Sequence, residues 1–136
     1  QQVLINPDKA HHKTTPKFER ARHVISADGS QMLYISGTAA IRGEESCKAD
    51  IVEQTALTME NIAKLADKET LEAYGVKEAA ELEYKMLRIY LKHNFNLEVV
   101  KNWFETYYPS TPKVFLLADI CREELLIEIE GIAAEK

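Results

Sequence analysis

The length, composition and charge of the chain describe one ordinary globular domain. Its 136 residues fit a single domain; 46% are hydrophobic, 29% are charged, and the formal net charge is −5. This acidic balance gives no electrostatic footprint for nucleic acid, and no apolar run approaches the roughly 18 residues of a membrane span. The two cysteines, Cys47 and Cys121, each lack a second cysteine nearby. We therefore expect a cytoplasmic protein with no metal, no cofactor, no nucleic-acid partner and no membrane segment.

The first quarter of the chain predicts an arm followed by a hairpin. Residues 1–17 contain two prolines and little periodicity, so we interpret them as an N-terminal arm, with the domain proper at residues 18–136. Residues 18–26 and 32–36 have the composition of strands. The sequence Ala-Asp-Gly-Ser at 27–30 separates them and is typical of hairpin loops.

Small residues and then a helix follow this hairpin. Gly37 and Thr38 lie where the second strand ends, and such small side chains suit either a strand end or the wall of a ligand site. Asp50 is a candidate helix N-cap, with Glu53 three residues later as in a capping box. The periodicity predicts a helix from residue 51 to about residue 67. Its core-facing residues are Ile51, Thr55, Thr58, Ile62 and Leu65.

The second half of the chain predicts three strands and one more helix. Residues 82–91 form the clearest strand, and residues 114–118 and 125–132 form the last two, joined by a charged turn. Between them, Asn96 is a candidate N-cap for a helix that ends before Pro109. The apolar side of this helix is expected to hold Val99, Val100, Trp103, Phe104 and Tyr107.

This order of elements predicts a two-layer α+β fold, with one mixed sheet covered on one face by two helices. Side chains alternate along a strand, so Arg88, Tyr90 and Glu128 belong to the uncovered face. If the last two strands form a simple hairpin, Glu128 lies opposite Leu117. A sheet face that mixes polar and apolar side chains is usually closed by another subunit, so we expect an oligomer.

Several short motifs make the chain similar to a known family. Ile35-Ser36-Gly37-Thr38, the helix with Gln54 and Asn61-Ile62, and the closing stretch at 127–133 resemble the YjgF/RidA superfamily across residues 18–133. This resemblance implies the fold of the bacterial trimeric chorismate mutases, a homotrimer, and ligand sites in clefts between subunits. The stretches at 36–46 and 118–131 resemble the catalytic domain of the chorismatases, which hydrolyse chorismate. Chorismatases carry a second, degenerate domain of the same fold before the catalytic one.

The resemblance carries over to individual residues with two departures. Enamine deaminases of the superfamily clamp a substrate carboxylate with an arginine where this chain has Lys113, and they have a cysteine where this chain has Phe115. Lysine keeps the charge but loses the bidentate fork. Glu128 and Cys121 match positions linked to catalysis in the chorismatase branch, and Arg88 matches a basic position suited to a substrate carboxylate.

The chemistry implied by the resemblance needs a carboxylic acid near neutrality. An enol ether or enamine is protonated on carbon and water then adds, so the acid must have a raised pKa and a carboxylate clamp must hold the substrate. We expect Glu128 as the acid with Cys121 beside it, and a small carboxylated metabolite as the partner. Five residues are expected to bind this substrate: Arg88, Lys113, Gly37, Thr38 and Tyr90.

Plainer interpretations remain open for every one of these residues. Glu128 suits a subunit edge, Cys121 suits an apolar pocket, and Arg88 and Lys113 suit ion pairs between subunits. Tyr90 suits packing, and strand-end geometry alone explains the small residues. The alternative function is a non-catalytic domain that senses a small carboxylate, which the lysine at position 113 favours. Ribonuclease activity fits poorly with the acidic charge.

Overall fold

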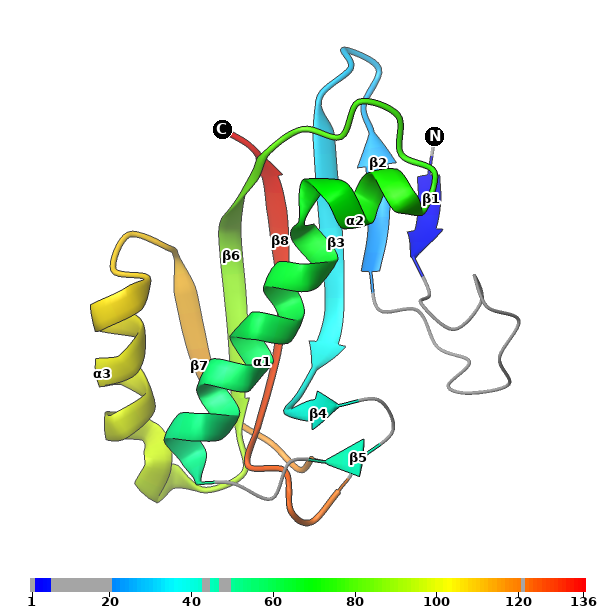
Figure 1. Cartoon of the computed structure of the whole chain (residues 1–136). Coiled ribbons are helices and arrows are strands. Elements are labelled where there is room, and N and C mark those ends of the chain that lie inside the picture. The colour runs from blue at the N-terminus through cyan, green and yellow to red at the C-terminus, as the bar shows by residue number, and fades with distance from the viewer. Residues whose placement is uncertain (1, 6–20, 43–44, 47–49, 121) are drawn as a thin grey trace.

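The fold is a six-stranded mixed sheet with helices on one face, as the sequence predicts (Figure 1). The computed structural model describes residues 2–5, 21–42, 45–46, 50–120 and 122–136. Its strands are β1 (Gln2–Ile5), β2 (Ala21–Ile25), β3 (Gln31–Thr38), β4 (Ile41–Arg42), β5 (Glu45–Ser46), β6 (Leu82–Leu91), β7 (Lys113–Leu117) and β8 (Ile127–Glu135). Its helices are α1 (Ile51–Ala66), α2 (Lys68–Ala73), the 3₁₀ turn η2 (Asn94–Asn96) and α3 (Leu97–Tyr107). The large sheet has the order β1-β2-β3-β8-β6-β7, and β4 pairs with β5 separately.

The N-terminal half of the sheet is antiparallel. The strands β2 and β3 form the predicted hairpin, whose turn is closed by hydrogen bonds between the backbones of Ser26, Gly29 and Ser30. The strand β1 pairs with the outer edge of β2, so part of the predicted arm belongs to the sheet.

The helix α1 begins as its sequence predicts and buries four of its five predicted core-facing residues, whereas Ile51 is partly buried. The Asp50 carboxylate accepts a hydrogen bond from the backbone N–H of Glu53 at 2.8 Å, which satisfies a donor that the first turn leaves unpaired. The helix buries Gln54, Thr55, Leu57, Thr58, Met59, Ile62 and Leu65. Figure 1 shows α1 lying across β3, β8 and β6.

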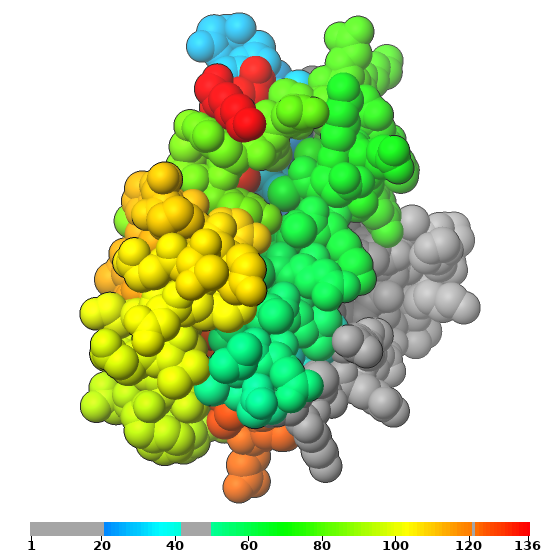
Figure 2. Space-filling model, turned by 60° about the vertical axis from the view of Figure 1, so that its left-hand side comes forward, coloured from blue at the N-terminus to red at the C-terminus, as the bar shows by residue number. Residues whose placement is uncertain are grey.

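Alternation along β6 and β8 separates the two faces of the sheet. Leu87, Ile89 and Leu91 of β6 are buried beneath the helices, together with Ile127 and Ile129 of β8. The helices α1 and α3 stand side by side and cover most of this face (Figure 2). The residues between them in sequence, including Arg88 and Glu128, therefore lie on the open face.

The predicted hairpin of the last two strands is wrong. The strand β7 pairs in parallel with β6, and β8 lies on the other side of β6, between β3 and β6. Because α3 connects β6 to β7, the three elements form a βαβ unit, which allows parallel pairing that a tight turn cannot. Glu128 consequently lies opposite Tyr90 and not opposite Leu117.

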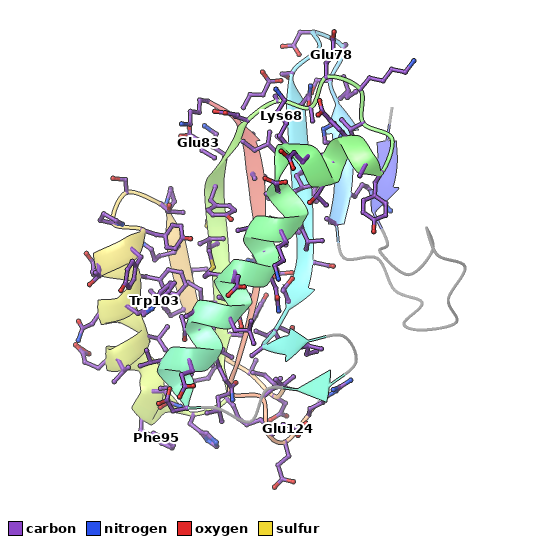
Figure 3. The ribbon with its side chains drawn as sticks, in the orientation of Figure 1. Lys68, Glu78, Glu83, Phe95, Trp103 and Glu124 are labelled. Atoms are coloured by element: carbon purple, nitrogen blue, oxygen red, sulfur yellow. The ribbon has the colours of Figure 1, made fainter. Side chains whose placement is uncertain are left out.

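The apolar side of α3 is narrower than predicted. Val100 and Phe104 are buried, whereas Val99 is 42% exposed and Tyr107 is 63% exposed. Trp103 is half-buried and its ring centroid lies 4.8 Å from that of Tyr107 (Figure 3). Phe104 contacts Phe115 of β7 edge to face, which fixes α3 against the end of the sheet.

The start of α3 also differs in detail from the prediction. Asn96 occupies the N-cap position but its side chain makes no capping hydrogen bond, because the turn η2 leads directly into the helix. None of the helices in the described part of the chain is long and apolar enough to cross a membrane.

Candidate functional site

Glu128 lies on the open face of β8, directly against the backbone of Gly37. A β-carbon built on Gly37 would stand 2.6 Å from Oε2 of Glu128 and 2.9 Å from its Cδ. Only glycine leaves room for the carboxylate in this position. The pairing of β3 with β8 shifts register between Ile35 and Thr38, so this close approach occurs at an irregular point of the strand. The structure therefore joins two residues that the sequence predicts for the site.

The surroundings of Glu128 favour its protonated form. The carboxyl is half-buried, and this burial raises its pKa above the ordinary value. The negative charge of Glu130, two residues along the same face, raises the pKa further. A carboxyl group whose pKa is raised holds its proton at higher pH, which is the property required of a general acid.

Arg88, Tyr90 and Glu130 form a connected polar group beside Glu128. The Tyr90 hydroxyl donates a hydrogen bond to Oε1 of Glu130 at 2.5 Å. The same oxygen lies 3.5 Å from Nη1 of Arg88, the residue directly opposite Glu130 in the sheet. Tyr90 and Glu130 both raise the pKa of the guanidinium, with the hydrogen bond to Tyr90 the larger cause. The side chain of Arg88 remains 57% exposed and carries its charge to the open face.

A groove of about 630 Å³ crosses the open face beside this group. It runs over β2, β3, β8 and β6. Its polar lining comes from Arg22, Tyr34, Ser36, Arg88 and Glu130, and its apolar lining includes Met86 and Ile132. A groove that combines cationic and apolar walls suits a small organic anion.

The remaining predicted site residues do not join this group. Lys113 is paired with Leu87 across β6 and β7, so alternation directs its side chain to the helix-covered face, away from Arg88. Thr38 is buried, and its hydroxyl donates a hydrogen bond to the carbonyl of Ser36 at 2.9 Å. Cys121 lies outside the described residues, as does Cys47.

The loop that leads into β8 is held by a buried amide of α1. Gln54 is fully buried; its Nε2 donates to the carbonyl of Glu124 at 2.9 Å and its Oε1 accepts from the N–H of Leu126 at 2.8 Å. The ammonium of Lys92 donates to the carbonyls of Arg122 and Glu123 at 2.9 and 3.0 Å. Figure 3 shows Glu124 at the same end of the molecule as Phe95. These contacts fix where β8 begins and hence where Glu128 lies.

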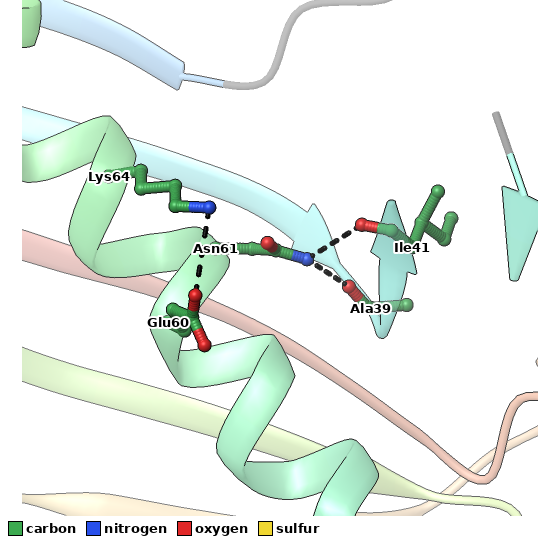
Figure 4. A network of polar contacts seen from close by, with 5 residues as sticks. All are labelled: Ala39, Ile41, Glu60, Asn61 and Lys64. Carbon is green, nitrogen blue, oxygen red and sulfur yellow. Dashed lines mark hydrogen bonds and ion pairs between the residues drawn. The ribbon is translucent and has the colours of Figure 1, made fainter. Parts of the chain in front are cut away.

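A second amide of α1 holds the loop after β3. Nδ2 of Asn61 donates to the carbonyls of Ala39 and Ile41 at 2.9 and 3.0 Å (Figure 4). Gln54 and Asn61 thus hold the loops next to the two strands that meet at Gly37 and Glu128.

Glu130 is the residue of this group that the sequence analysis misses. Its position two residues after Glu128 places it on the same face, so alternation alone could have found it. The groove residues Arg22 and Tyr34 are also missed, because their place depends on the order of strands in the sheet. Within the described ranges, no three His, Cys, Asp or Glu side chains gather closely enough to hold a metal ion.

Comparisons with known proteins agree with the fold and the motifs. No protein-family model matches the chain. It is 32% identical over 130 residues to a 3-hydroxybenzoate synthase and 34% identical over 134 residues to a chorismatase, both from Streptomyces hygroscopicus. These alignments cover 91% and 92% of this chain, but 38% and 39% of the relatives. The chain therefore spans about two fifths of the length of the curated relatives it matches.

Solved structures extend the comparison. A chorismatase crystal structure superposes with a TM-score of 0.79 at 28% identity, over 97% of this chain and 43% of that one. YyfA from Yersinia pestis, of the Rid protein family, superposes with a TM-score of 0.68 at 21% identity, over 98% of both chains. The chain therefore has the fold of the Rid protein family and is similar over nine tenths of its length to part of the chorismatases.

Proposed function

We propose that the chain is a hydrolase domain that acts on a small carboxylated enol ether or enamine, with Glu128 as the general acid. The observation that carries this proposal is the half-buried Glu128, whose pKa is raised and which stands against Gly37 beside the Arg88 group. The similarity to chorismatases supports an enol ether substrate such as chorismate.

The reaction uses one acid and one water molecule. Glu128 transfers its proton to the terminal carbon of the double bond, and the lone pair of the neighbouring oxygen or nitrogen stabilises the cation. Water adds to the cationic carbon and returns a proton to Glu128. The adduct then collapses to a ketone and releases an alcohol from an enol ether, or ammonia from an enamine. Arg88 holds the substrate carboxylate so that the reacting carbon faces Glu128.

We further propose that a second subunit completes the site, in a homotrimer. Several large side chains on the open face are exposed in the single chain, among them Tyr34, Met86, Val114 and Leu116. An exposed face of this kind favours association. Burial by a neighbouring subunit would raise the pKa of Glu128 further. Light scattering coupled to size-exclusion chromatography measures the number of subunits.

The direct test is incubation of the chain with chorismate and, separately, with a dehydroalanine-type enamine, with pyruvate measured as product. We expect pyruvate from one of them and none after Glu128→Gln, which keeps the size of the side chain but carries no acidic proton. The control is Glu83→Gln, which removes an exposed glutamate of β6 that pairs with Lys85. Glu83 lies at the opposite end of the sheet from Glu124 (Figure 3). Full activity of Glu128→Gln would contradict the mechanism.

A non-catalytic carboxylate sensor is the second candidate. The placement of Lys113 on the helix-covered face favours it, because the open face then has Arg88 but not the second predicted cation for a substrate carboxylate. Binding of chorismate or the enamine in calorimetry, with no pyruvate from either, would select the sensor.

A further inference from the structure

Glu130 joins the two residues on which the proposed function rests, yet that mechanism gives it no role. It follows Glu128 by two residues on the open face of β8 and lies opposite Arg88 on β6. Its Oε1 is shared by the Tyr90 hydroxyl at 2.5 Å and by Nη1 of Arg88 at 3.5 Å. The group lies at the wall of the groove, which both Arg88 and Glu130 line.

The two hydrogen bonds of Glu130 differ in length, at 2.5 Å from Tyr90 and 3.5 Å from Arg88. The short bond from Tyr90 fixes the carboxylate of Glu130 against the sheet. The contact with Arg88 is at the limit of hydrogen bonding, and the guanidinium is more than half exposed. A ligand carboxylate can bind Arg88 in bidentate geometry, with N–O distances of about 2.7–2.9 Å. Such a ligand would replace the contact between Arg88 and Glu130 and leave the hydrogen bond from Tyr90 to Glu130 in place.

Glu130 also lies closer to Arg88 in the register of the sheet than Glu128 does, because it is directly opposite Arg88 and Glu128 is opposite Tyr90. The two glutamates are the carboxylates on this face of β8, about 7 Å apart along the strand. Without the charge of Glu130, the nearest carboxylate for Arg88 on this strand face would be Glu128. A guanidinium close to Glu128 would stabilise its ionised form and remove the proton that the reaction needs.

We propose that Glu130 is a positioning residue, which holds Arg88 at the groove for a ligand carboxylate and keeps Glu128 in its acid form. This inference rests on the proposed function, because it assigns roles to Glu128 and Arg88. The charge of Glu130 already raises the pKa of Glu128, second to burial, which agrees with the geometry.

The groups facing Glu128 on the described strands are consistent with this assignment. Tyr90 and Arg88 face it from β6. Lys92 directly follows β6, and its ammonium donates to the carbonyls of the loop at 122–123. The strand β3 contributes Ser36 and Gly37, neither of which has an acidic or basic side chain. Glu130 is thus the one further carboxylate among these groups.

The test compares three variants by measurements that need neither substrate nor turnover. Glu130→Gln keeps the shape of the side chain and removes its charge, and Glu130→Asp keeps the charge and shortens the side chain. Tyr90→Phe removes the hydroxyl that bonds to Glu130 and that also interacts with Arg88. Carbon-13 NMR of the carboxyl groups gives the pKa of Glu128, and nitrogen-15 relaxation gives the order of the Arg88 guanidinium. Glu83→Gln is the matched control on the same sheet.

We expect Glu130→Gln to lower the pKa of Glu128 and to increase the motion of Arg88. Glu130→Asp should keep the raised pKa of Glu128 while Arg88 becomes more mobile, because only the reach of the side chain has changed. Tyr90→Phe should leave the charge of Glu130 in place and increase the motion of both Glu130 and Arg88. In an active chain, Glu130→Gln should also move the alkaline limb of the pH–rate profile to lower pH and raise KM roughly tenfold.

The proposal is overturned if Glu130→Gln changes neither the pKa of Glu128 nor the motion of Arg88 by more than the Glu83→Gln control does. The proposal is also overturned if Glu130→Asp lowers the pKa of Glu128 as much as Glu130→Gln does. These measurements are made on the chain without ligand. A chain that forms no pyruvate would therefore refute the hydrolase function and still decide the role of Glu130.

Discussion

The two faces of the sheet are built from alternate residues of the same strands, yet they differ in what they contain. On the helix-covered face, Leu33, Leu87, Ile89, Ile127 and Ile129 are completely buried. On the open face, the residues between them include exposed aromatic and charged side chains, and the group of Arg88, Tyr90, Glu128 and Glu130. Alternation therefore separates buried core residues from exposed polar residues at a spacing of one residue along each strand.

The largest expected effect tests this separation with two adjacent residues of β3. Leu33 is completely buried and Tyr34 is 45% exposed on the other face. We expect Leu33→Ala to lower the free energy of unfolding by about 2–5 kcal/mol, because it leaves a cavity under the helices. Tyr34→Ala should lower the free energy of unfolding of the monomer by less than about 1 kcal/mol.

Urea unfolding, with the midpoint and slope fitted for both variants, measures the two costs. The measurement is made at a protein concentration where the chain is monomeric, since Tyr34 lies on the face that we expect a second subunit to cover. Equal losses for Leu33→Ala and Tyr34→Ala would break the comparison, because the two faces would then contribute alike to stability.

The sequence predicts the composition of each face but not the neighbours of each strand. Alternation along residues 82–91 and 125–132 assigns Arg88, Tyr90 and Glu128 to one face, because a period of two needs no knowledge of the fold. The neighbour of β7 depends on how α3 packs against the sheet, through contacts such as the one between Phe104 and Phe115. The charged turn between the last two strands suggests a simple hairpin in the sequence, whereas β7 pairs in parallel with β6.

The register of the strands also explains which of the predicted site residues lie close together. Gly37 and Glu128 come together across β3 and β8. The motif resemblance names both residues, whereas the irregular register that brings them into contact is visible only in the structure. The resemblance assigns Lys113 to the carboxylate clamp, but the register of β7 directs its side chain to the helix-covered face, away from Arg88. A matched position in the sequence does not specify a face of the sheet, whereas the register does.

A smaller effect is expected when an added β-carbon is compared at two glycines on neighbouring strands, Gly131 of β8 and Gly37 of β3. A β-carbon on Gly131 would lie 2.7 Å from the backbone oxygen of Met86 and 2.8 Å from Cδ2 of Leu87. Backbone cannot move away easily, so we expect Gly131→Ala to cost about 1–3 kcal/mol of unfolding free energy. A β-carbon on Gly37 would meet only the end of the Glu128 side chain, at 2.6 Å from Oε2.

Gly37→Ala should therefore cost little stability, under about 1 kcal/mol, since Glu128 can rotate away. The rotation should nevertheless remove the carboxyl from its half-buried position and lower its pKa toward the ordinary value. Urea unfolding and carbon-13 titration of Glu128 measure the two consequences. Two results together would contradict the close contact between Gly37 and Glu128: a Gly37→Ala chain that loses as much unfolding free energy as Gly131→Ala, and an unchanged pKa of Glu128.

The smallest expected effect concerns how the stability of the chain depends on pH through Glu128. Its folded pKa is raised by burial and by Glu130, so the folded chain binds this proton more tightly than the unfolded chain does. The contribution of Glu128 to stability is therefore full below its unfolded pKa and is lost as the pH rises through its folded pKa. Glu128→Gln does not titrate, so it should melt higher than the parent chain at pH 7, by roughly 1–3 °C, and should lose this advantage near pH 4.

Glu83 supplies a control of opposite sign on the same sheet. The hydrogen bond from Lys85 lowers the pKa of Glu83, so its contribution is present at neutral pH and is lost as the pH falls through its folded pKa. Glu83→Gln should accordingly give no gain in melting temperature at pH 7, since this exposed pair contributes little. Calorimetric scans of both variants at pH 4 and pH 7 measure the difference. If Glu128→Gln melted lower than the parent chain at pH 7, Glu128 would be stabilised as a carboxylate, and the open face would lack the acid that the reaction needs.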